Sequence, residues 1–275
     1  MRVLLAAIAL AQTFTWVSSA LSAPAVEPSP LERPRLVETT FKSVDATIAA
    51  QWDFPKRSPA PLVVLIPASG SLDRNGMPPG SSDPGGTGIY AQLADKLVED
   101  GFAVFRFDKP GTGKSSRGSY NTPRSDALEA YAAAVKHARV DLDNLYLLGH
   151  SYGTDAIAGI YGRYESIAPP AGVVLLSNRV GETQIVKIVA PTLIVVGERN
   201  PDDLYQRGRF AAEARKGADK TPLETKLVTV PEAGHALLAE TEAGGAKSIS
   251  VDPRAVSAIL DWLMERVGKG AQASR

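Results

Sequence analysis

Residues 145–154 read LYLLGHSYGT, and this stretch decides the fold. The apolar run LYLL is typical of a buried strand, and the small and apolar residues that follow, DAIAGIYG, favour a helix. Between them, Gly149 to Gly153 form a GxSxG motif centred on Ser151. In this context the serine occupies a sharp, strained turn with its hydroxyl exposed, and glycines are needed because strand and helix approach closely. The stretch therefore predicts a nucleophilic serine at the end of a strand.

Strands and helices alternate outward from this stretch. A weakly alternating segment at 36–54 predicts two antiparallel edge strands. Apolar runs predict strands at 62–66, 102–107, 172–176, 192–196 and 227–230, and helical spacing predicts helices at 89–100, 125–139, 203–216 and 253–267. The long loop at 67–88 is rich in glycine and proline and excludes a regular element. The pattern predicts an α/β fold with a doubly wound, mostly parallel sheet.

Composition narrows the chemistry. The 275-residue chain balances 30 basic against 30 acidic residues, so we expect no nucleic-acid partner. It has no cysteine, which excludes disulfides, thiolate metal sites and a cysteine nucleophile. The three histidines are scattered, and we expect neither a zinc site nor a cofactor. A small-molecule substrate remains the expected partner, and nothing in the sequence predicts an oligomer.

The N-terminus predicts export. Arg2, an apolar run at 3–11 and small residues after it are typical of a secretory signal peptide, which we place at 1–25. An uncleaved membrane anchor is the alternative, although polar residues interrupt the run early. We expect a flexible leader at 26–35, one domain at 36–268 and a flexible tail at 269–275. The expected location is periplasmic or secreted, without stable membrane insertion after cleavage.

Four motifs in chain order carry a family resemblance: LVVLIPASG at 62–70, DKPGTGKS at 108–115, GHSYG at 149–153 and PEAGH at 231–235. With them the chain resembles the α/β-hydrolase superfamily, most of all its bacterial exported, serine-aminopeptidase-like or esterase-like branch. The resemblance implies acyl transfer through a serine. Only residues 177–191 separate two of the predicted strands, so we expect little or no helical cap at that point.

A serine hydroxyl needs a base within hydrogen-bond reach. His150 adjoins Ser151 and should point away from it, and His137 lies in the preceding helix. His235 follows the strand at 227–230, where the family places its base, and is the candidate.

The acid of the expected triad is the open assignment. The family position, three residues after the glycine that ends strand TLIVVG, holds Asn200. An asparagine orients the imidazole but supplies no charge to stabilise imidazolium. Asp203 and then Asp202 are our first candidates, because a small shift of the turn would bring either to the base. The remaining alternatives are Asn200 itself and an acid from elsewhere, such as Glu198 or Asp155.

Two backbone amides should complete the oxyanion hole. One is that of Tyr152, at the start of the helix after the serine; the resemblance places the other at Ser69, or at its neighbours Ala68 or Gly70. The sequence thus predicts a serine hydrolase acting on ester bonds, with amide or peptide bonds as the second candidate class. The alternative is a degenerate, non-catalytic member of the fold that binds a ligand or partner. Gly111 to Ser115 resemble part of a phosphate-binding loop, but Asp108 stands where that motif needs a glycine.

Overall fold

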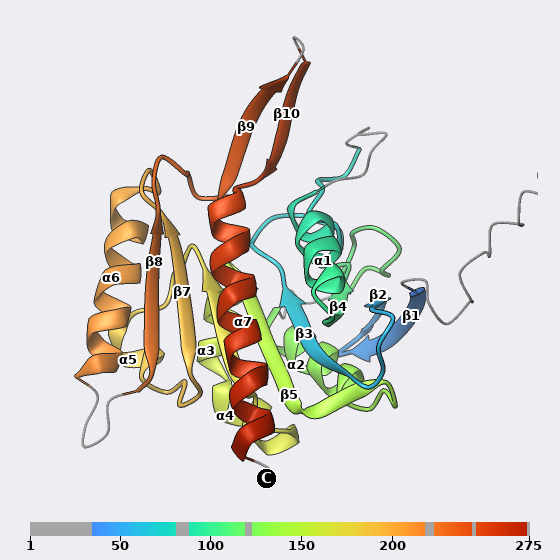
Figure 1. Ribbon diagram of the computed structural model, residues 1–275. Helices are drawn as coiled ribbons and strands as arrows, with labels where there is room; N and C mark the ends of the chain where they lie inside the picture. The colour runs from blue at the N-terminus through green and yellow to red at the C-terminus, as the bar shows by residue number, and fades with distance from the viewer. Residues whose placement is uncertain (1–34, 81–87, 119–122, 218–222, 244–245, 274–275) are drawn as a thin grey trace, which may run out of the picture.

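The computed structural model describes residues 35–80, 88–118, 123–217, 223–243 and 246–273 (Figure 1). The predicted signal peptide and nearly all of the predicted leader lie outside these residues. In the described part of the chain, no helix is long and apolar enough to cross a membrane.

An eight-stranded sheet forms the centre of the fold, in the order β1-β2-β4-β3-β5-β6-β7-β8 (Figure 1). The strands β1 and β2 pair antiparallel at one edge, and β2 is antiparallel to β4. All remaining neighbours pair in parallel, which confirms the predicted doubly wound, mostly parallel sheet. The bounds are β1 Arg35–Ser43, β2 Ala46–Phe54, β3 Ala60–Ile66, β4 Ala103–Phe107, β5 Val140–His150, β6 Gly172–Leu176, β7 Thr192–Gly197 and β8 Thr225–Val230.

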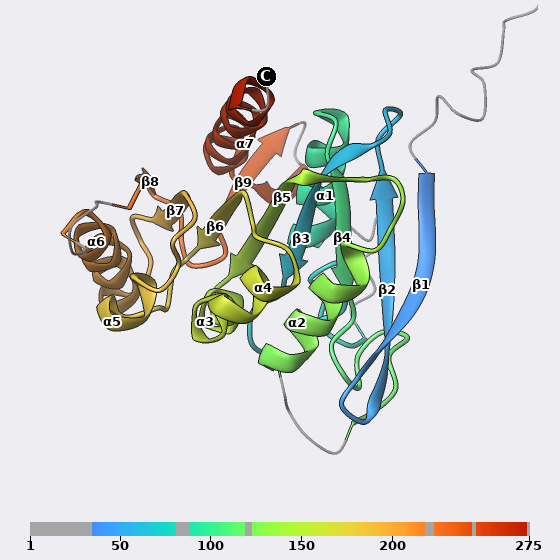
Figure 2. The same ribbon diagram turned by 90° about the horizontal axis from the view of Figure 1, so that it is seen from below.

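Helices cover both faces of this sheet (Figure 2). On one face lie α1 and α7, and on the other α2, α3, α4, α5 and α6. Their bounds are α1 Ile89–Glu99, α2 Pro123–Ala134, α3 Tyr152–Gly159, α4 Tyr161–Ile167, α5 Glu182–Ile185, α6 Asp202–Lys216 and α7 Pro253–Ala273. The short segment between β6 and β7 holds only α5, so no helical cap is inserted there, as predicted.

The alternation of side chains along β3 shows why continuous apolar runs became central strands. Leu62 and Val64 belong to the core under α2 to α6, whereas Val63 and Leu65 belong to the core under α1 and α7. Successive side chains of a strand point to opposite faces, so a strand with helices on both sides must be apolar at every position. Burial of these side chains holds the carboxyl ends of β3, β5, β6 and β7 at one edge.

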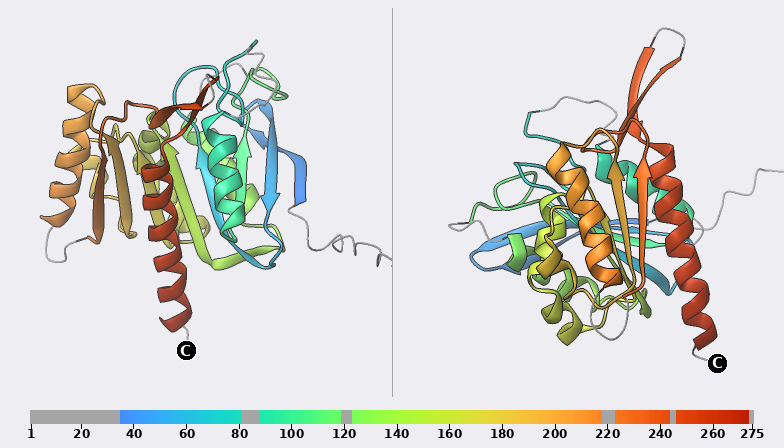
Figure 3. Two further views of the ribbon diagram at one scale, coloured as in Figure 1. Left: turned by 45° about the horizontal axis from the view of Figure 1, so that its top comes forward. Right: turned by 90° about the vertical axis from the view of Figure 1, so that its left-hand side faces the viewer.

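Several elements differ from the prediction. Helix α2 ends at Ala134 rather than near residue 139, and the helix after the elbow is broken at Ile160 into α3 and α4. A hairpin of β9, Leu238–Ala243, and β10, Ala246–Val251, projects beyond the sheet and was not predicted (Figure 3). Its Leu238 and Ile249 are exposed, so these two apolar residues do not mark a buried strand face. Helix α7 continues into the expected tail as far as Ala273.

Candidate active site

Ser151 lies in the strained turn that the motif predicts. It follows β5, precedes α3 and has φ of 51° and ψ of −111°, in the left-handed half of conformational space where a side chain costs energy. A Cβ at Gly153 would clash with the carbonyl oxygen of Ile66, and one at Gly149 would lie 2.7 Å from the Ile157 side chain. Both glycines are therefore required by the close approach of α3 to β3 and β5.

Hydrogen bonds fix this turn to the neighbouring loop. The Ser151 amide donates to the carbonyl of Leu176 at 2.8 Å. The Thr154 hydroxyl donates to the Ser151 carbonyl at 2.6 Å and accepts the amide of Arg179 at 3.0 Å. The end of β6 is thereby tied to the elbow, and the Arg179 backbone is held beside the serine.

His235 contacts the serine. Its Nε2 lies 2.8 Å from Ser151 Oγ, across 84 positions of sequence. The base sits in the loop after β8, where its carbonyl accepts the Ser177 hydroxyl at 2.5 Å. Partial burial lowers the pKa of His235, the nearby positive charge of Arg179 lowers it further, and the charge of Asp203 opposes both. The imidazole is therefore held toward its neutral form, which is the form able to accept a proton.

Asn200 contacts the other nitrogen of the base. Its Oδ1 lies 2.7 Å from His235 Nδ1, and its side chain is buried. An accepting Oδ1 requires a proton on Nδ1, which leaves the Nε2 lone pair directed at the serine hydroxyl. The turn that carries Asn200 is fixed, because its amide donates to the Gly197 carbonyl at 3.1 Å and the Arg199 amide donates to the Ala233 carbonyl at 2.9 Å. Asn200 thus selects the tautomer that a general base needs.

The expected carboxylates do not occupy that position. Asp202 and Asp203 are exposed in the first turn of α6, and no hydrogen bond joins either to His235 within the described residues. Both aspartates follow Pro201 and begin the helix, where its dipole favours acidic side chains, and this is why they do not turn toward His235 as expected. Asp203 acts on the base only through its field.

The two more distant alternatives have other partners. The Glu198 carboxylate accepts the amide of Glu232 at 3.0 Å. Asp155 pairs with Arg124 at 2.9 Å. Neither carboxylate has a hydrogen bond to the base in the described part of the chain, so Asn200 is the residue that holds Nδ1.

The backbone amides predicted to bind an oxyanion differ in whether they already donate a hydrogen bond. Among the loop and turn hydrogen bonds of the described residues, neither the Ser69 nor the Tyr152 amide donates to a backbone carbonyl. The Ala68 amide is different, because it donates to the Tyr90 hydroxyl at 2.7 Å. The Ala68 amide is therefore already engaged, and those of Ser69, its neighbour Gly70 and Tyr152 remain the candidates for the role.

A buried pair of side chains lies behind this turn. The Tyr90 Oη is 3.2 Å from His150 Nδ1, and His150 Nε2 is 3.3 Å from the carbonyl oxygen of His235. Complete burial lowers the pKa of His150 to about 4, so its ring is neutral at physiological pH. A Tyr90 hydroxyl that donates to Nδ1 leaves the Nε2 proton for the His235 carbonyl. The pair links the turn at Ala68 to the loop of the base, and nothing in the sequence predicted it.

His137 and the turn that resembles a phosphate-binding loop both contact other parts of the fold. His137 follows the end of α2 instead of lying within the helix as the sequence predicted, and its ring packs against Trp52 and Phe54 with centroid distances of 4.7 and 4.8 Å. The Lys114 ammonium pairs with Glu38 at the surface.

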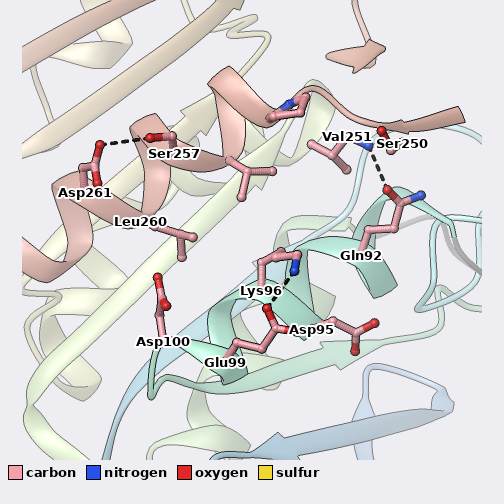
Figure 4. Close-up of a pocket in the computed structure, with 12 residues that line it drawn as sticks. Gln92, Asp95, Lys96, Glu99, Asp100, Ser250, Val251, Ser257, Leu260 and Asp261 are labelled. Carbon is pink, nitrogen blue, oxygen red and sulfur yellow. Dashed lines mark hydrogen bonds and ion pairs between the residues drawn. The ribbon is translucent and has the colours of Figure 1, made fainter. Parts of the chain in front are cut away.

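A hollow between α1 and α7 lies away from this chemistry (Figure 4). Its lining includes Asp95, Lys96 and Asp261, and the Val251 amide donates to Gln92 at 2.8 Å at its rim. None of the residues around the serine lines it. Across the described residues, no cluster of side chains could hold a metal ion.

Comparisons with known proteins agree with this architecture. The family model for the alpha/beta hydrolase fold matches residues 78–178, which include the elbow. The fold is similar to that of Est1E from Butyrivibrio proteoclasticus, solved with ferulic acid bound, with a TM-score of 0.61 and 17% identity over 84% of this chain and 99% of that one. No curated protein sequence matches the chain.

Two further solved structures are similar. Esterase LipW from Mycobacterium marinum has a TM-score of 0.61 and 16% identity over 85% of this chain and 82% of that one. Dipeptidyl peptidase 4 from Porphyromonas gingivalis has a TM-score of 0.61 and 14% identity over 84% of this chain, which spans 35% of the peptidase. With its sheet order and serine elbow, the chain has the α/β-hydrolase fold, and residues 78–178 match the family model of that name.

Proposed function

We propose that this protein is a serine hydrolase that cleaves carboxylic esters through an acyl-enzyme. The observation that carries the proposal is the contact of Ser151 Oγ with His235 Nε2 at 2.8 Å, with Asn200 fixing the opposite nitrogen at 2.7 Å. A nucleophile in contact with a base that a third group orients is the arrangement that activates a hydroxyl at neutral pH.

The reaction follows from these positions. Ser151 Oγ attacks the ester carbonyl carbon while its proton passes to His235 Nε2. The carbonyl oxygen becomes an oxyanion, which the Ser69 and Tyr152 amides stabilise; one such donor contributes about 3 kcal/mol to lowering a barrier. The imidazolium then protonates the leaving alcohol as the C–O bond breaks. Water repeats the sequence on the acyl-enzyme and releases the acid and free Ser151.

Asn200 favours esters over amides. A neutral carboxamide orients the imidazole, but it offers no negative charge to stabilise the imidazolium that forms in the transition state. An amide suffers more from the missing charge, because its amine must be protonated in order to leave, whereas an alkoxide is a better leaving group. The esterase names among similar folds fit this substrate class, and we place peptide bonds second.

The residues around Ser151 define an open site for small-molecule esters. No cap lies between β6 and β7, so access from the carboxyl edge of the sheet depends on loops. A second hollow, lined by Val180, Asp203 and Phe210 among others, lies between the segment after β6 and α6. We assign this hollow and the loops at the carboxyl edge of the sheet to the two sides of an ester substrate.

A fluorophosphonate probe tests the proposal. Incubation of the protein with the probe, followed by mass spectrometry, should place the adduct on Ser151. Labelling and hydrolysis of p-nitrophenyl acetate and butyrate should both disappear in Ser151→Ala and His235→Ala. A folded protein with no labelling and no hydrolysis would instead support the alternative, a non-catalytic ligand-binding member of the fold.

Export is part of the proposal and rests on the signal-like residues 1–25. Expression of the full chain in a bacterium, followed by fractionation and N-terminal sequencing, tests it. The expected result is a periplasmic or secreted protein that begins near residue 21 or 26. An uncut protein in the membrane fraction would support the anchor alternative.

A further inference from the structure

Lys109 lies immediately after Asp108 in the turn that follows β4, and its side chain reaches the loop after β3. Its Nζ donates to the carbonyl of Ala68 at 3.0 Å and to the carbonyl of Gly70. Both acceptors flank Ser69, the residue whose amide the mechanism uses. The contacts join two loops that are about 40 residues apart in the chain.

Because the peptide group is planar, these contacts also fix the direction of the Ser69 amide. The Ala68 carbonyl and the Ser69 N–H belong to one planar trans peptide group, so they point in opposite directions. With the carbonyl directed at Lys109, the Ser69 N–H points away from the ammonium. The Ala68 amide on the preceding peptide is held by Tyr90 Oη at 2.7 Å. Both polar groups of Ala68 are thus fixed by side chains, and within the described residues no backbone carbonyl accepts the next N–H, that of Ser69.

Lys109 is itself firmly placed. The Thr112 hydroxyl donates to the Lys109 carbonyl at 2.9 Å and lies 3.0 Å from the Leu72 carbonyl. The neighbouring Asp108 is buried and accepts the Arg74 guanidinium at 2.7 and 2.9 Å. A charged hydrogen bond at such a site is roughly twice as strong as a neutral one. The ammonium therefore has a rigid base from which to hold the 68–70 turn.

The same side chain lines a hollow next to the elbow helix. This small hollow is also lined by Ala68 and by Tyr152, which carries the other candidate oxyanion amide. Asp126 also lines this hollow, and its charge partly offsets the effect of burial, which lowers the pKa of Lys109. The side chain that holds the 68–70 turn thus lines the same hollow as Tyr152.

We propose that Lys109 is a positioning residue for the oxyanion hole: its ammonium holds the Ala68 and Gly70 carbonyls so that the Ser69 amide faces the reacting oxygen. This inference rests on the proposed function for its catalytic consequence. The contacts also polarise the Ala68–Ser69 peptide group, which makes its N–H a stronger donor. The benefit appears when negative charge develops on the substrate, so it acts on the transition state more than on substrate binding.

Kinetics of Lys109→Met test the inference, with Lys114→Met as the matched control. Lys114 lies in the same turn, but its ammonium is exposed and pairs with Glu38. For p-nitrophenyl butyrate, we expect Lys109→Met to lower kcat roughly 10- to 100-fold with KM nearly unchanged, somewhat less than the loss of a whole oxyanion donor. Lys109→Arg should recover part of the rate, and Lys114→Met should match the unaltered protein.

Two readouts separate positioning from other roles. An alkylboronic acid, which forms a tetrahedral anion on the serine, should bind Lys109→Met more weakly by about the factor lost in kcat. An increase in KM alone, or unchanged kcat and boronate affinity, would overturn the inference.

Amide hydrogen exchange tests the same contact without activity. The Ala68 amide, bonded to Tyr90, should exchange at least roughly tenfold faster in Lys109→Met than in Lys114→Met, because the turn is released. Equal exchange in the two variants would show that Lys109 does not hold the turn. If exchange is faster in Lys109→Met but Ser151 of the unaltered protein does not react with fluorophosphonate, the contact of Lys109 with the turn is supported and the proposed function is contradicted. Should Lys109→Met fail to fold, Lys109→Arg and Lys109→Gln are compared by the same exchange measurement.

Discussion

The carboxamide oxygen of Asn200 lies 2.7 Å from Nδ1 of His235, where a serine triad usually places a carboxylate. The amide nitrogen of the same side chain is buried and has no hydrogen-bond partner in the described structure. An asparagine here performs half of the usual task, because it fixes the tautomer of the base without offsetting the charge that the base acquires. The balance between orientation and charge is what the first prediction addresses.

Asn200→Asp should move the acid limb of the pH profile. A carboxylate next to Nδ1 favours imidazolium and should raise the pKa of His235 by about 1–3 units. Because His235 must be neutral to accept the serine proton, the acid limb of kcat/KM moves to higher pH by the same amount. Above that limb, kcat should increase, and more for an amide substrate than for an ester. Rates measured with both substrates from pH 5 to 9 check this expectation.

The same substitution should cost stability. The second carboxylate oxygen would replace the Asn200 amide nitrogen, which already has no partner, and the substitution would add a buried negative charge that loses its hydration. Urea unfolding at pH 8 measures the loss. An acid limb that does not move, in a protein that remains folded, would rule out the contact between Asn200 and His235 as the one that controls the base.

Asp203→Asn should have a small effect in the opposite direction. The Asp203 charge raises the pKa of His235, so its removal should move the acid limb slightly to lower pH. Turnover should change less than roughly tenfold, because no hydrogen bond between Asp203 and the base is lost. Asp202→Asn is the control and should leave the profile in place. A loss of turnover greater than tenfold in either variant would restore that aspartate as the acid of the triad.

Much of the fold could be predicted because its signals are local. The apolar run at 62–66 and the glycines around Ser151 reflect burial on two faces and a close approach, and both requirements act on adjacent residues. The β9–β10 hairpin was not predicted because its apolar residues Leu238 and Ile249 are exposed and do not mark a buried face. The break at Ile160 escaped because an apolar residue carries no stop signal for a helix.

The site was harder to predict where a side chain's position depends on the exact shape of a turn. Ser151 and His235 follow from motif and chain order, whereas the partner of Nδ1 depends on where one turn after β7 ends. The sequence signal for Asn200 was its position three residues after Gly197. The aspartates were ranked above it because a triad usually needs a charged acid. The contacts of Tyr90 and Lys109 with Ala68 join distant segments, so no sequence pattern could reveal them.

Gly153→Ala should destabilise the protein severely. The added methyl would clash with the Ile66 carbonyl, and because backbone lines both sides, α3 would have to move away from β3. We expect a loss of more than about 2 kcal/mol in the free energy of unfolding and no measurable turnover. The control is Gly162→Ala in α4, where a Cβ has open space and should stabilise the helix by about 0.5–1 kcal/mol. Equal stability of the two variants by urea unfolding would contradict the close-packing argument.

His150 should make the protein less stable in acid. Burial holds its pKa at about 4 in the folded chain, against an ordinary 6.5, so the unfolded chain binds the extra proton first. Stability from this group is therefore complete above pH 6.5, falls as the pH drops to 4, and changes little below that. The loss over this window is about 3 kcal/mol. The slope of unfolding free energy between pH 6.5 and 4, measured in urea, should become shallower in His150→Gln.

The control for that prediction is Tyr90→Phe. This substitution removes the hydroxyl that contacts Nδ1 and accepts the Ala68 amide, but it keeps the titrating imidazole in its buried place. Its overall stability should fall by about 1–3 kcal/mol because a buried amide loses its acceptor, while the slope between pH 6.5 and 4 should persist. If His150→Gln keeps the full slope, the acid sensitivity arises elsewhere and the buried neutral histidine does not cause it. Because Tyr90 also holds the turn at Ala68, Tyr90→Phe should lower kcat more than His150→Gln lowers it.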